Sequence, residues 1–292
     1  MLRVCVALSV CALAGCAALP AADKATALGE AISTTGKVLR DSLAANRAIS
    51  VRIGEEDQAY RYITNTAFSL DDKPVGMLSE KEVGVRLAAI AALEQYGDSL
   101  AKAIDEGTVD KLQQASVNLG GAVAGIAGSV SPAASPIVVP AIKVAARIGG
   151  FLLGNAYANE IHAIIVARNP DVKAVVALLQ RDFEQLPHLM GIQLADYKSR
   201  RHDTLRYLRD GEEIAIDRLR LYNEYKTARQ DVAVVALLSK AAAKYKNVLT
   251  ELETAHNAVA TDQPNGEILL RRFVALSAEL ADLMKAMRRE NS

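Results

Sequence analysis

The sequence lacks tryptophan, and its aromatic residues amount to only 4% of the chain, so the core must be built from aliphatic side chains. Cysteine is confined to the first sixteen residues, at Cys5, Cys11 and Cys16. A disulfide framework or a thiolate metal site is therefore excluded beyond residue 16. Neither sign of charge is in excess, because 34 Lys and Arg residues balance 34 Asp and Glu residues. This balance argues against nucleic acid as a main partner, since proteins that neutralise many phosphates are usually strongly basic.

Motifs for catalysis or cofactor binding are also missing. The sequence has no Gly-x-Ser-x-Gly elbow and no phosphate-binding loop, and the glycines at 120, 121 and 125 do not follow a strand. No two histidines are spaced i, i+4, so we expect each to be solvated or packed: His162, His188, His202 and His256. The acidic runs 55–57 and 212–213 are typical of solvated helix faces. Tyrosines at helical spacings predict packing between helices, with the hydroxyl at the surface. We therefore predict no enzyme activity, cofactor, metal or small-molecule substrate.

The N-terminus has the features of an export signal. Arg3 supplies a positive charge, and residues 4–14 form an apolar run that is too short to span a bilayer. The run ends in Leu13-Ala14-Gly15-Cys16, which resembles the lipobox of bacterial lipoproteins. An ordinary signal peptide, cleaved at a nearby Ala-x-Ala-like site, is the alternative.

This resemblance implies a cleaved signal peptide over residues 1–15 and a diacylglycerol on Cys16. Residues 16–22 would then form a lipidated tether. Ala17 follows the cysteine, where Asp is the retention signal for the inner membrane in enterobacteria. The resemblance therefore implies a protein of the Gram-negative cell envelope that is anchored in the outer membrane and faces the periplasm. Several acyl chains anchor a protein firmly where one would be marginal.

From residue 23 onward the apolar residues follow helical spacings, and no alternating strand pattern appears. We predict one all-α domain over 23–292, an elongated helical bundle with long antiparallel helices. The first stripe is narrow, as in a coiled coil, and predicts a helix over residues 23–65. We expect a loop at 69–76, a capping box at 79–82, a break at Asn169-Pro170, a break or kink at Leu186-Pro187, a turn at 261–266 and a last helix over 267–289.

An uncharged stretch, residues 112–142, lies at the centre of the chain. Small residues recur at i, i+4, i+8 before and after its prolines, and such spacing lets two helix backbones approach closely. We predict a Gly/Ala/Pro-rich antiparallel helical hairpin over about 109–168, with residues 131–140 near its tip. The residues expected to pack in it are Gly121, Gly125, Ser129, Gly150, Gly154 and Ala158.

A simple membrane span is not predicted for this hairpin. Nine strongly apolar residues in 137–156 favour insertion by roughly 4 to 5 kcal/mol. Lys143 and Arg147 oppose it by roughly 2.5 to 3.5 kcal/mol each. In an oligomer, however, the two cations share one face that could line a pore, and the 112–158 hairpin resembles helical pore-forming toxins in character, without a shared motif.

Two functions therefore remain open at the level of sequence. The first is a non-enzymatic, lipid-anchored scaffold that acts through a protein partner or through self-association. The alternative is a membrane-active protein that inserts the central hairpin. The sequence names no partner for either function.

Overall fold

The computed structural model describes residues 21–64, 66, 80–103, 108–130, 153–210 and 217–290. These residues form six α-helices and no strand, which confirms the all-α helical bundle. The helices are α1 Ala21–Ile63, α2 Glu80–Lys102, α3 Val109–Val130, α4 Leu153–Asp210, α5 Arg218–Ala260 and α6 Gly266–Glu290. The predicted signal peptide, Cys16 and the predicted tether up to residue 20 lie outside the described residues.

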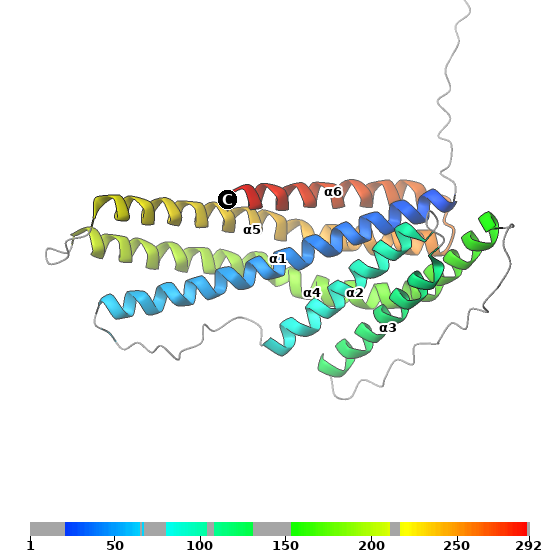
Figure 1. Ribbon diagram of the computed structural model, residues 1–292, viewed down its shortest axis with the longest axis horizontal. Helices are drawn as coiled ribbons and strands as arrows, with labels where there is room; N and C mark the ends of the chain where they lie inside the picture. Colours follow the sequence, from blue (N-terminus) through cyan, green and yellow to red (C-terminus); the bar gives the residue numbers. More distant parts are fainter. Residues whose placement is uncertain are drawn as a thin grey trace, which may run out of the picture.

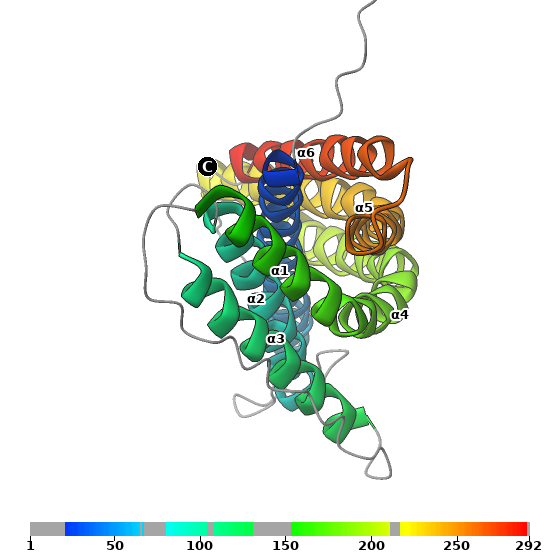
Figure 2. The ribbon, with the colours of Figure 1, turned by 90° about the vertical axis from the view of Figure 1, so that its right-hand side faces the viewer.

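Four long helices form the body of the molecule, and two shorter ones cover one side of it (Figure 1). Helix α5 packs against α4 and α6, and α1 closes the bundle by packing against the same two helices. Helix α2 lies along α1, and α3 lies against α2 and α4 (Figure 2). With a rise of 1.5 Å per residue, the 58 residues of α4 would span roughly 85 Å if straight, so the bundle is elongated.

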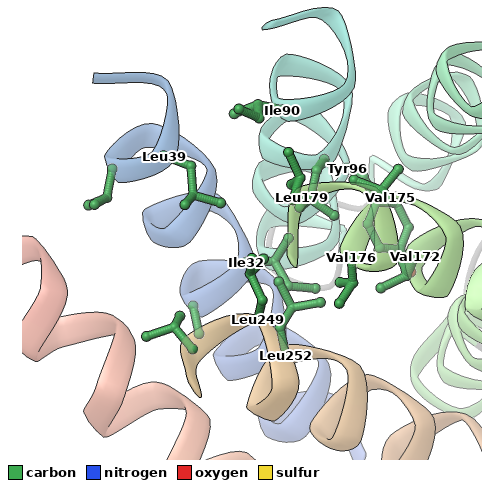
Figure 3. Close-up of a cluster of buried hydrophobic side chains, with 14 of the residues drawn as sticks. Ile32, Leu39, Ile90, Tyr96, Val172, Val175, Val176, Leu179, Leu249 and Leu252 are labelled. Carbon is green, nitrogen blue, oxygen red and sulfur yellow. The ribbon is translucent and has the colours of Figure 1, made fainter. Parts of the chain in front are cut away.

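The core is aliphatic, as the composition predicts. Figure 3 shows side chains from α1, α2, α4 and α5 converging on one cluster, and almost none of their surface is exposed. Val172, Val175, Val176 and Leu179 form the contribution of α4 to this cluster. The period of these residues places them on one face of the helix, so α4 is held by burial of that face.

The predicted stripe of α1 is confirmed as its buried face, and two buried hydroxyls of this helix have partners in other helices. Leu28, Ile32 and Leu39 are fully buried. Thr35, also fully buried, shares a hydrogen bond of 2.9 Å with Ser277 of α6. Ser42 accepts a hydrogen bond from the hydroxyl of Tyr245 in α5. Buried hydroxyls that are paired cost little and fix the register between helices.

Helices α1 and α2 approach each other closely, and glycines permit this approach. A Cβ built on Gly97 would lie 2.5 Å from the backbone nitrogen of Ser33 and 2.7 Å from the carbonyl oxygen of Gly29. A Cβ built on Gly29 would lie 2.4 Å from the nitrogen of Ala101. Real Cβ atoms do not approach backbone atoms so closely, so these glycines set the distance between the two helices.

The predicted break at Pro170 is wrong, because α4 continues through this residue, and the helix also continues through Pro187, where a break or kink is predicted. A proline inside a helix removes one hydrogen bond and costs about 3 kcal/mol. Burial of the apolar residues that follow Pro170 offsets this cost, because Val172, Val175 and Val176 are fully buried. Figure 2 shows that the path of α4 bends in its N-terminal part, as helices do at a proline.

The predicted antiparallel hairpin over 109–168 is not confirmed. Figure 1 shows α3 and α4 starting near the same end of the bundle and running in the same general direction. They meet near their N-termini, where Gln113 donates a hydrogen bond of 2.9 Å to Glu160. The residues predicted for the tip, 131–140, lie outside the described residues. The relative direction of two helices depends on the path of the segment that connects them, and the local spacing of small residues does not determine that path.

Candidate functional site: a basic groove at the distal end of the bundle

One end of the bundle is formed by the last turns of α1 and α4 and the first turns of α5. We call it the distal end, because it lies opposite the end at which α1 begins (Figure 1). Two ion pairs also place the end of α1 beside the end of α4: Glu56 pairs with Arg201, and Asp57 pairs with Arg200. About 35 helical residues separate Ala21 from Glu56, which corresponds to about 50 Å.

A groove of about 750 Å³ runs between α4 and α5 at the distal end. Its cationic side chains come from both helices and are Lys198, Arg201, Arg206, Arg209, Arg218 and Arg229, together with His202. Among the described residues that line it, none is acidic. The groove is therefore strongly basic, although the chain as a whole has no net charge.

The floor of the groove is apolar. Leu205, Leu221 and Val232 are half-buried and Ala228 is buried, whereas every lining cation except Arg201 is exposed. Tyr222 and Tyr225 also line the groove and are 62% and 55% exposed. Charged heads that stand in water above an apolar floor can hold a ligand with one anionic and one apolar part.

Three of the cations already have partners. Arg201 donates to Glu56 at 3.0 Å and to Glu224 at 2.5 Å, and these carboxylates raise the pKa of Arg201 despite its partial burial. Arg206 and Arg209 share Asp210. By contrast, Lys198, Arg218 and Arg229 form no ion pair with another residue of the described ranges. These last three cations are the ones that a ligand could pair with.

A polar network beneath the groove holds the three helices together. The Tyr197 hydroxyl donates a hydrogen bond of 2.6 Å to Asp231, which also accepts one from Arg52 of α1. Burial, together with the carboxylate of Asp231, raises the pKa of Tyr197 well above its usual value. The tyrosine is therefore a neutral donor at every physiological pH. The network links α1, α4 and α5 and fixes the orientation of the groove walls.

A second polar cluster lies in the core and is structural. His256 of α5 approaches the Tyr96 hydroxyl of α2 at 3.1 Å through Nε2 and the Asn169 side-chain oxygen of α4 at 3.1 Å through Nδ1. The amide oxygen accepts, so Nδ1 carries the proton and Nε2 accepts from Tyr96. Burial, with a smaller contribution from Lys173, lowers the pKa of His256 to about 3. Tyr96 and His256 are fully buried and Asn169 is half-buried.

The described part of the chain does not test the packing predicted for the central hairpin. No described atom lies within 4 Å of a Cβ built on Gly121 or Gly125, and the surroundings of their predicted partners Gly150 and Gly154 are not described, so this packing stays a prediction. Ala158 is half-buried in α4. Three other predicted positions lie outside the described residues: Gly150, Lys143 and Arg147. The backbones of Ser129 and Gly154 are helical, but the surroundings of these two residues are not described.

The groove residues were missed by sequence reasoning, although they leave a signal. Four of the tyrosines expected to pack between helices are instead more than 40% exposed: Tyr62, Tyr207, Tyr222 and Tyr225. All four lie at the distal end. The helical spacing of Arg218, Tyr222, Tyr225 and Arg229 places them on one face of α5. A count of charges along the chain hides this face, because the acidic residues of the same region point elsewhere.

The fold and the groove define an elongated all-α bundle with a basic, tyrosine-bearing end. Comparison of the sequence and structure with known proteins matches no family model, no curated protein and no solved structure. Within the described part of the chain, no helix is long and apolar enough to span a membrane, and no cluster of three metal-ligating side chains is present.

Proposed function

We propose that this protein is a non-enzymatic interaction protein of the Gram-negative cell envelope, anchored in the outer membrane through Cys16 and facing the periplasm. One observation carries the proposal: four exposed tyrosines, Tyr62, Tyr207, Tyr222 and Tyr225, gather at the end of the bundle farthest from the start of α1. Tyrosine and arginine are the residues most enriched where protein interfaces bind most strongly. An anchor at one end and such a surface at the other suit a protein that holds a partner at about 50 Å from the membrane.

Replacing Cys16 by alanine is expected to abolish lipidation, because the thioether forms on this sulfur. Cells that express the chain would be labelled with radioactive palmitate, and the label on the purified protein would be measured. Cys11→Ala is the matched control, since Cys11 lies inside the apolar run. It should keep full incorporation. Equal labelling of the Cys16→Ala variant and the wild type would refute the anchor.

A photo-crosslinking residue at Tyr62 is expected to capture a protein partner in cells. The same residue at Ile268 is the control, because the two side chains have similar exposure, 64% and 70%, but lie at opposite ends of the bundle. We expect one discrete high-mass adduct from position 62 and none from position 268, measured by immunoblotting and mass spectrometry. Identical adducts from both positions, or none from position 62, would contradict a distal interaction surface.

A further inference from the structure

The groove between α4 and α5 has two chemically distinct parts. Its floor is apolar and half-buried, whereas its rim carries the three cations that lack an ion-pair partner among the described residues, Lys198, Arg218 and Arg229. By comparison, Arg206 and Arg209 pair with Asp210. A rim with unpaired cations on both helices attracts an anion that lies between them.

The apolar floor requires more than an anion. A free phosphate would occupy the rim and leave the floor in contact with water, so the floor would add nothing to its binding. Tyr222 and Tyr225 stand between the two parts, and tyrosine rings suit a boundary that is apolar on one side and wet on the other. The occupant must therefore carry an apolar chain next to its anionic group.

The size of the groove favours a single small amphiphile over a protein segment. Its volume of about 750 Å³ lies within the range of roughly 300 to 1,000 Å³ that is typical of small-molecule sites. We propose that the groove binds one anionic lipid molecule, with its phosphate between Lys198, Arg218 and Arg229 and its acyl chain along Leu205, Leu221 and Val232. Arginine suits this role, because its guanidinium group donates two parallel hydrogen bonds to phosphate oxygens.

The test uses the full chain with Cys16→Ala, so that no acyl anchor of the protein itself can enter the groove. Isothermal titration calorimetry measures the binding of palmitoyl-lysophosphatidylglycerol below its micellar concentration. Palmitoyl-lysophosphatidylcholine has the same chain without net charge, and glycerol 3-phosphate has the anion without the chain. We expect the anionic lipid to bind at least about tenfold more tightly than either control, which corresponds to about 1.4 kcal/mol.

Two double variants remove the same amount of charge from α5 and separate the groove from its surroundings. Arg218→Gln with Arg229→Gln removes two rim cations, whereas Arg220→Gln with Lys226→Gln removes two exposed cations that do not line the groove. All four side chains are exposed, so neither variant disturbs the core. We expect the first to weaken lipid binding at least about tenfold, or 1.4 kcal/mol, and the second to change it less than twofold.

Three results would overturn the proposal: equal binding of the choline lipid, equal binding of glycerol 3-phosphate, or equal losses in the two double variants. Equal binding of the choline lipid would show that the groove does not recognise the anionic charge. Equal binding of glycerol 3-phosphate would show that the groove does not bind the acyl chain. Equal losses in the two double variants would show that the cations act only through long-range attraction. These outcomes are independent of the anchor and of the protein partner. Crosslinking from Tyr62, which does not line the groove, tests that partner separately.

Discussion

Replacing Gly97 by alanine is expected to lower the free energy of unfolding by about 3 kcal/mol or more, at the upper end of what overpacking costs. The added Cβ would lie 2.5 to 2.8 Å from Ser33 N, Gly29 O and Ile32 Cβ. Two of these are backbone atoms of α1, which cannot move away as a flexible side chain does. Helices α1 and α2 would have to separate and expose the apolar surface between them, including Leu93 and Leu100. Denaturant titration followed by circular dichroism measures the loss.

Gly121→Ala is the matched control for Gly97→Ala. Both glycines lie inside helices, but no described atom is within 4 Å of a Cβ on Gly121. Alanine is the better helix former by about 0.8 to 1 kcal/mol, so this variant should be slightly more stable than the wild type. If Gly97→Ala were as stable as Gly121→Ala, the close contact of α1 with α2 would be refuted. If Gly121→Ala were strongly destabilised, the open surroundings of Gly121 would be refuted instead.

These glycines show how far the sequence alone can lead. Small residues at a spacing of four occur at Gly29 and Ser33, at Gly97 and Ala101, and again at Gly121 and Gly125. The first two sets form the close contact and the third does not. Whether a set of small residues faces another helix depends on which helices pack against each other. The local spacing of residues does not determine that packing. Periodicity therefore predicted the helices, and the buried stripe of α1 in particular, but not their pairing.

The prolines and the groove give the same lesson for different reasons. Pro170 and Pro187 signal a break locally, yet α4 continues because burial outweighs the lost hydrogen bonds. The groove depends on two segments, residues 198–209 at the end of α4 and residues 218–229 at the start of α5. The cations of the two segments come together only when α4 and α5 pack against each other. Across 197–229, nine Lys and Arg residues stand against six Asp and Glu residues, so a sum along the chain gives only a small excess and ignores which face of a helix each charge occupies.

Acid is expected to destabilise the protein through His256 before the carboxylates titrate. In the unfolded chain this histidine binds a proton below about pH 6.5, but in the fold only below about pH 3. Between these values the unfolded state binds more protons, so the free energy of unfolding falls as the pH falls. The loss approaches about 1.4 kcal/mol per pH unit, or about 2 kcal/mol between pH 7 and pH 5. Denaturant titrations at a series of pH values measure this slope.

His256→Gln should flatten the slope between pH 7 and pH 5, whatever it does to stability at pH 7, because glutamine does not titrate. An amide can still accept from Tyr96 and donate to Asn169, the two partners of the imidazole. His202→Gln is the control, because its side chain is 71% exposed and its replacement leaves the buried cluster of His256 intact. The buried histidine joins α2, α4 and α5 at one point, so its protonation would weaken the contact among these three helices. An equal slope in wild type and His256→Gln would assign the acid sensitivity to other groups and refute this role.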